Sequence, residues 1–337
     1  MITPPADPRA TARPAGLTDT IWAGFDLVHR HFWLLILPIA VDILMWLGPQ
    51  LSVAPIVDGW STSAAAPAVA DDVLARSMDE ARGELLRSGD ALKRYNLLSL
   101  LALPVLGLGI PSSRAGLSGI GPVLPIQSES WASLTIIGTV MLGLVLAAVY
   151  YGLLGHLVRE GVLRAREFAR DLPTVLSALF TLFGLLIVVG MAVGVPMGAL
   201  LTAMQAASPA LASLIGPMII GVLLWAMVYL FFTIDALYVS QVWPASAVQN
   251  SVRVVRHNFW STLGFIAVFL LIFSGFPLVW DRLATTQGAP GVMVGIVGHS
   301  YISSALAAAS MTYYKERFER MIASHEGSNA PVAPVRS

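Results

Sequence analysis

The chain has 337 residues, of which 56% are hydrophobic and 12% are charged, and its mean hydropathy is +0.74. A soluble domain carries roughly 25% charged residues, so this composition excludes an ordinary soluble protein and indicates a membrane protein. Basic and acidic residues number 20 each, which argues against a nucleic-acid partner, and the absence of cysteine excludes disulfides and thiolate metal sites.

Residues 1–17 form a proline-rich arm without apolar periodicity, which we predict to be disordered. The arm lacks the apolar core of a cleavable signal peptide, so the first span is expected to serve as an uncleaved insertion signal. Residues 18–51 are predicted to form a surface helix over 19–31 and a span from about Phe32 to Leu51. Pro38 and the pair Gly48-Pro49 are expected to kink or end that span.

Residues 52–130 differ from the rest of the chain and are predicted to form an external insertion. Charges and apolar residues alternate at helical spacing from Asp71 to Tyr95, which predicts an amphipathic helix facing water. The apolar stretch 97–110 has about 14 residues, is broken by proline and glycine, and suits a re-entrant or surface-lying segment. The 71–95 helix is the most plausible docking face for a protein partner.

Residues 131–314 are predicted to form a five-span bundle, and residues 315–337 a cytoplasmic tail. The spans are expected at about Trp131–Leu157, Thr174–Met197, Leu211–Ser240, Phe259–Asp281 and Val292–Tyr313. Basic residues are concentrated in the arm, the tail and the loops around 159–170 and 253–256, which predicts that both termini are cytoplasmic. Counting 97–110 as a seventh span would place the later basic loops on the opposite side.

The stretch 248–260 repeats a pattern from the N-terminus. Val248, Val252, Val255 and Phe259 have the spacing of Ile21, Phe25, Val28 and Phe32, and Phe32-Trp33 and Phe259-Trp260 close the two copies. Each copy predicts an amphipathic helix on the membrane surface that leads into a span. Residues 158–172 carry a weaker version, so three duplicated units, 18–157, 158–240 and 241–314, are one reading and an unrelated hydropathy pattern is the other.

Four polar residues within the spans are candidates for a cavity or an intramembrane site: Asp42, Asp235, His299 and Ser303. Asp42 is either a proton or cation site or a protonated side chain bonded to a neighbouring helix. Asp235 is near a span end and is expected to cap a helix or to pair with a basic residue such as Arg253. His299 and Ser303 belong to a polar stripe that either lines a cavity or bonds across helices.

Gly190, Gly194 and Gly198 form a ladder at four-residue spacing, which predicts close packing of helix backbones. Histidines at metal-ligand spacing, a phosphate-binding glycine loop and a nucleophile motif are all missing from the sequence. We therefore expect no cofactor, no bound metal and no enzymatic activity.

The pattern Ala247-x-x-x-Ser251-x-x-x-Val255-x-x-Asn258-Phe259-Trp260 before a span resembles a bacterial family. It is similar to the membrane domain that accompanies glycerophosphoryl diester phosphodiesterases, and to related six-span proteins. The resemblance covers mainly residues 225–314, with an echo at 20–48. It implies a membrane module, and since the phosphodiesterase barrel is missing here it gives no reason to expect hydrolase activity.

The sequence thus predicts an all-α transmembrane bundle of about six spans in a cell membrane, with cytoplasmic surface helices and one external insertion. The first functional hypothesis is a non-enzymatic module that contacts the lipid bilayer and binds a protein partner. The alternative is a transporter of a small solute or lipid with a cavity near Asp42 and His299. No sequence feature sets the oligomeric state.

Overall fold

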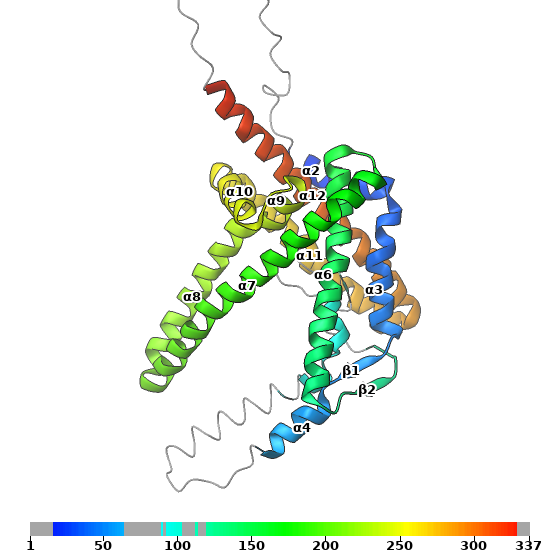
Figure 1. Ribbon diagram of the computed structural model, residues 1–337, viewed down its shortest axis with the longest axis vertical. Coiled ribbons are helices and arrows are strands. Elements are labelled where there is room, and N and C mark those ends of the chain that lie inside the picture. The colour runs from blue at the N-terminus through cyan, green and yellow to red at the C-terminus, as the bar shows by residue number, and fades with distance from the viewer. Residues whose placement is uncertain (1–15, 64–88, 90–91, 103–111, 114–118, 329–337) are drawn as a thin grey trace, which may run out of the picture. The chain divides into compact units, whose positions relative to one another are not determined.

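The computed structural model describes residues 16–63, 89, 92–102, 112–113 and 119–328, without the side chains of 60–63 and 325–328. Figure 1 shows a predominantly helical chain. In chain order its elements are α2 (Leu17–Arg30), the 3-10 helix η1 (Phe32–Leu35), α3 (Ile36–Leu47), β1 (Gln50–Ser52), α4 (Ala54–Ser63), the 3-10 helix η2 (Leu97–Ala102), β2 (Val123–Pro125), α6 (Glu129–Glu160), α7 (Ala165–Ala207), α8 (Pro209–Leu230), α9 (Thr233–Val239), α10 (Pro244–His257), α11 (Phe259–Gln287) and α12 (Ala289–Ser328).

Among the described residues, five helices are long and apolar enough to cross a membrane: α6, α7, α8 together with α9, α11 and α12. The first predicted span corresponds to η1 and α3, which meet the same criterion together with α2 and are bent from it by 88°. A coiled, internally bonded backbone is what hydrocarbon tolerates, so apolar stretches of this length fold as helices. The predicted all-α membrane bundle is confirmed.

Several predicted boundaries are corrected by local chemistry. The first span ends at Leu47, because Gly48 leaves the helical conformation ahead of Pro49. The span expected at 211–240 is broken between α8 and α9, around Phe231 and Phe232. The weak third surface pattern is not a separate helix: α6 continues to Glu160, and α7 then runs unbroken from Ala165 through the span.

The predicted insertion is only partly described. The amphipathic helix expected from Asp71 to Tyr95 lies largely outside the described residues. The first part of the 97–110 segment is η2, and its continuation over 103–110 lies outside the description.

The chain divides into two compact units. Unit 1 comprises Met1–Leu34, Ala148–Leu278 and Tyr301–Ser337, and unit 2 comprises Leu35–Ala147 and Val279–Ser300. The helices α6, α11 and α12 each contribute residues to both units.

An aromatic stack forms the core of unit 1. The Tyr313 ring of α12 stacks on Phe265 of α11 at 4.6 Å between centroids, and on Phe232 before α9 at 5.4 Å. All three side chains are almost completely buried. Stacked rings of this size bury a large apolar area and fix the mutual position of α9, α11 and α12.

Unit 2 contains a small sheet that the sequence did not predict. Strands β1 and β2 pair in parallel, with Gln50 opposite Val123 and Ser52 opposite Pro125. The Gln50 amide donates to the carbonyl of Gly119 at 2.5 Å, and the Asn96 carboxamide oxygen accepts from the backbone N–H of Leu51 at 3.0 Å. These bonds fasten both ends of the insertion next to the membrane-spanning part of this unit.

The surface helices α2 and α10 are two copies of one design, and both belong to unit 1. Each has 14 residues, and in each the Phe-Trp pair begins two residues after the helix ends. Their buried positions also correspond when counted from that pair: Thr20, Gly24 and Val28 in α2 match Ala247, Ser251 and Val255 in α10. The two surface helices therefore share a pattern of buried positions as well as a sequence pattern.

Candidate functional site

Asp42 lies in the second half of α3 and is fully buried. Its carboxylate accepts hydrogen bonds from the Ser112 hydroxyl, from the Ser113 hydroxyl at 2.8 Å and from the Ser113 backbone N–H at 3.1 Å. A carboxylate at the centre of a span costs about 3 kcal/mol to insert. The three donors offset part of this cost, and the two serines are 70 and 71 residues away in the sequence.

His299 of α12 lies near Asp42 within unit 2. The imidazole is 5% exposed and interacts electrostatically with the Asp42 carboxylate. The structure thus brings together the two residues that the sequence analysis placed at one cavity. Ser303, which is also buried, belongs to unit 1.

Asp235 is on α9 in unit 1 and is 6% exposed. Its carboxylate accepts a hydrogen bond of 2.5 Å from the Ser310 hydroxyl of α12. The expected pairing with Arg253 does not form, because that residue is on the exposed side of α10. A hydroxyl from the neighbouring helix, instead of a surface cation, satisfies this acid.

Two buried tyrosines, Tyr151 and Tyr314, interact electrostatically with Asp235, and the sequence analysis missed the buried tyrosines of this unit. The Tyr150 hydroxyl donates to Ser304 at 2.5 Å, and Tyr314 shares a 2.9 Å hydrogen bond with Ser240. All four of these residues belong to unit 1. The signal available was the pair of Tyr-Tyr dipeptides, Tyr150-Tyr151 and Tyr313-Tyr314, inside otherwise apolar spans.

The glycine ladder Gly190, Gly194 and Gly198 lies on the exposed surface of α7. A Cβ atom added at any of the three would meet nothing within 4 Å. Helix α8 forms a hairpin with α7, closed at Ser208, and has no buried residue (Figure 1). The ladder therefore does not pack against another described segment of this chain.

The Phe-Trp pairs are exposed at the ends of the surface helices. Trp260 is 80% exposed and Trp33 is 38% exposed. Phe32 stacks on Tyr301 at 6.1 Å, and Phe259 stacks on Trp225 at 5.5 Å. In the first pair Phe32 is 53% exposed, more than Trp33, whereas in the second pair Trp260 is the outward ring. Both pairs place exposed aromatic rings at the start of a span, as interfacial anchors do.

Among the described residues, no group of three or more His, Asp or Glu side chains is placed to hold a metal ion. Comparisons with protein-family models, with curated proteins and with solved structures find no match.

Proposed function

We propose that this chain is a non-enzymatic membrane module that binds a transmembrane helix of a partner subunit through the glycine face of α7. The observation that carries the proposal is the exposed ladder of Gly190, Gly194 and Gly198, with open space at all three Cβ positions.

Helix association in a bilayer supports this assignment. Lipid tails are as apolar as leucine, so helices associate through close packing, which small residues at four-residue spacing permit. Other glycines of unit 1 already serve close approaches within the chain: a Cβ on Gly155 would lie 3.0 Å from Tyr238, and one on Gly24 would lie 2.6 Å from the backbone of Ala309. The ladder on α7 has the same composition and no such neighbour.

The burial of the hairpin gives a second argument. The buried residues of α7 are confined to its first half, from Val175 to Leu182. The second half of α7 and all of α8 are a long apolar surface, with side chains such as Val195 and Met218 exposed by 65% each. This surface suits lipid and a packed helix, and the ladder marks the part that favours the helix.

The test is helix association in liposomes. Fluorescently labelled protein is reconstituted at fixed protein-to-lipid ratio, and energy transfer measures self-association. Crosslinking in native membrane measures binding to other proteins. Gly194→Leu is expected to weaken the association that wild type shows by at least about tenfold, or ~1.4 kcal/mol.

The matched control is Gly184→Leu. Gly184 is also exposed on α7 with nothing within 4 Å of its Cβ position, but it is outside the ladder. The Gly184→Leu protein should associate as strongly as wild type does. Equal association of Gly194→Leu and wild type would contradict the proposal, and so would equal loss in both variants.

A second candidate function, transport of a small solute or lipid, is favoured by one observation. Asp42 and His299 are both buried and interact electrostatically within unit 2. If this pair carries protons, proteoliposomes under an imposed pH gradient should admit protons faster with wild type than with Asp42→Asn. Equal rates, with both proteins inserted equally, would exclude proton transport through this pair.

We also propose that the module is in a cell membrane with both termini cytoplasmic. The described turn between α6 and α7 is next to Arg159, Arg164 and Arg166, as cytoplasmic loops require. The resemblance to the phosphodiesterase-associated membrane domain agrees with a module that works beside another protein.

A further inference from the structure

The exposed side of α10, in unit 1, carries positive charge only. Arg253, Arg256 and His257 are exposed on this helix, and no residue from Gln241 to Asn258 is acidic. The two arginines are three positions apart, so their side chains are neighbours on one face of the helix. This surface is independent of the glycine face on α7 and of the function proposed for it.

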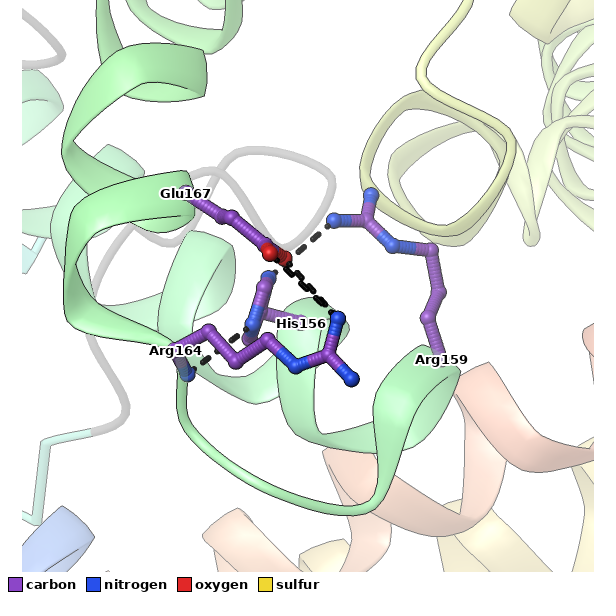
Figure 2. A network of polar contacts seen from close by, with 4 residues as sticks. All are labelled: His156, Arg159, Arg164 and Glu167. Carbon is purple, nitrogen blue, oxygen red and sulfur yellow. Dashed lines mark hydrogen bonds and ion pairs between the residues drawn. The ribbon is translucent and has the colours of Figure 1, made fainter.

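The two arginines of α10 are not engaged within the chain. Neither Arg253 nor Arg256 forms a hydrogen bond or an ion pair with any residue that the structure describes. Figure 2 shows the contrast on either side of the turn between α6 and α7, where Arg164 is paired with Glu167 at 3.3 Å and the guanidinium of Arg159 contacts a histidine ring. The charges of α10 are therefore available to a partner.

The elements that pack against α10 do not neutralise its charges. These elements are α9, α8 and α7. Helix α8 has no charged residue, and Asp235, the one charged residue of α9, is buried. Of the two acids of α7, Glu167 is paired with Arg164, and Asp171 accepts a hydrogen bond of 3.1 Å from Gln241, ahead of α10. The face of α10 therefore attracts anions from outside the chain.

The matched surface helix α2 has an acid where α10 has an arginine. Counted from the Phe-Trp pairs, Arg253 corresponds to Asp26, which is exposed and ion-paired with Arg30. Asp19 adds a second acid to α2. Because the two helices share their pattern of buried positions, the sign of the exposed charge is what distinguishes them. The basic surface is thus a property of α10 and not of the shared design.

Exposed tryptophans on both sides of α10 place the helix at the membrane boundary. Trp243 before the helix is 62% exposed and Trp260 after it is 80% exposed. Tryptophan prefers the level of the lipid headgroups, and α10 connects the span formed by α8 and α9 to the span α11 (Figure 1). Basic residues on a helix at this level attract anionic lipids.

From the unpaired arginines, the absence of acids and the flanking tryptophans, we infer that the exposed face of α10 binds the headgroups of anionic phospholipids. A soluble polyanion would find the same charge, but the tryptophans hold this face against the bilayer. The surface helix α2, with two acids and one arginine, does not share this preference.

The experiment measures lipid enrichment next to α10 by energy transfer. Because the chain has no cysteine, Gln249→Cys places a single donor dye on the exposed face, one helical turn before Arg253. The labelled full chain is reconstituted in phosphatidylcholine vesicles that contain acyl-labelled acceptor, either phosphatidylglycerol or phosphatidylcholine with identical chains. Half-maximal transfer should need at least about fivefold less of the phosphatidylglycerol acceptor. Raising the salt concentration should reduce this difference.

Two variants and a control make the test specific to α10. Replacing both arginines, as Arg253→Gln with Arg256→Gln, should abolish the preference, whereas Arg253→Lys with Arg256→Lys should retain it. The control is Arg166→Gln with Arg170→Gln, which removes the same charge from exposed positions of α7 and should keep the preference. All proteins are first checked for equal insertion and an unchanged thermal midpoint.

Three results would overturn the assignment. The first is equal transfer to both acceptors in the labelled parent protein, and the second is a preference that persists when both arginines of α10 are replaced by glutamine. The third is an equal loss of preference in the α7 control, which would indicate a general effect of surface charge. If the acceptors do not differ but soluble polyglutamate changes the dye emission, the face binds an acidic polypeptide and the lipid assignment is wrong.

Discussion

At the scale of single residues, the buried Asp carboxylates accept hydrogen bonds from serine hydroxyl groups. Asp42 takes its donors from Ser112 and Ser113, and Asp235 takes one from Ser310. A buried polar group without a partner costs about 1–3 kcal/mol, so each serine stabilises far more than an average surface hydroxyl. Serine is common in the sequence, and only its position opposite a carboxylate gives it this role.

Removing the Ser310 hydroxyl should show this dependence. We expect Ser310→Ala to lower the free energy of unfolding by about 1–3 kcal/mol, because the Asp235 carboxylate loses its hydrogen-bond donor inside the bundle. The measurement is unfolding by SDS in mixed micelles, followed by circular dichroism.

Thr312→Ala is the matched control for Ser310→Ala. Thr312 is on the same helix and is half-buried, but its hydroxyl bonds only the Ala308 carbonyl of its own helix, at 2.8 Å. Its loss should change stability by less than about 0.5 kcal/mol. A Ser310→Ala protein as stable as Thr312→Ala would show that the hydroxyl does not support Asp235.

The sequence predicted the acids but not their partners. An Asp or His within an apolar stretch is conspicuous because its cost is high, so Asp42 and His299 were found from the sequence alone. Ser112 and Ser113 were not, because their only distinction is proximity across about 70 residues of chain.

At the scale of elements, the buried faces of the surface helices are lined by smaller residues than the sequence predicted. The predicted apolar line included Phe25 and Val252, which are only half-buried. Gly24 and Ser251 are buried instead, and each allows a close approach to another backbone. Hydrophobic periodicity identifies an amphipathic helix, but it does not distinguish the side that enters lipid from the side that packs on protein.

Gly24 should not tolerate even a methyl group. A Cβ there would lie 2.7 Å from the Cβ of Ala309 and closer still to the Ala305 carbonyl oxygen. We expect Gly24→Ala to destabilise the protein by about 1–3 kcal/mol, because α2 must move away from α12. Thermal unfolding in detergent measures the effect.

Gly264→Ala is the matched control, and it should change the stability in the opposite direction to Gly24→Ala. Gly264 is exposed within α11, and a Cβ there would meet nothing within 4 Å. The higher helix propensity of alanine should stabilise the protein by up to about 1 kcal/mol. If both alanine variants shift the unfolding midpoint in the same direction, the close contact between α2 and α12 is wrong.

Ser251 satisfies two backbone groups at the break between α8 and α9. Its hydroxyl donates to the Tyr229 carbonyl at 2.7 Å and accepts from the Phe232 backbone N–H at 3.2 Å. Ser251→Ala should cost about 1–3 kcal/mol, since both groups lose a partner where the helix is interrupted. The exposed Ser246 of α10 is the control, and Ser246→Ala should be neutral within about 0.5 kcal/mol in the same SDS titration. Equal stability of the two variants would contradict this role.

The elements missed by the sequence analysis were the short ones. Long apolar helices such as α6 and α11 follow from composition, because lipid leaves the backbone no other choice. Strands β1 and β2 have three residues each and depend on partners far away in the chain, and the break at Phe232 depends on Ser251. Local propensity carries little information about structures that only distant contacts create.

At the scale of the whole molecule, one chain combines six predicted spans with a described surface too apolar for water. Exposed leucine, valine and methionine side chains cover α7, α8 and much of α11, whereas α12 is largely buried. The predicted arrangement places the turns at Gly161 and Ser240 on the cytoplasmic side. The turns at Ser208 and Gly288 then lie on the other side.

The most direct test uses the absence of cysteine from the chain. Single cysteines are introduced as Ala207→Cys, Gln287→Cys, Val162→Cys and Ser337→Cys, and intact cells are treated with a maleimide that does not cross membranes. The account predicts labelling of the first two, while the last two react only after the membrane is opened. Labelling of Gln287→Cys and Ser337→Cys from the same side would contradict the membrane arrangement on which every proposal above depends.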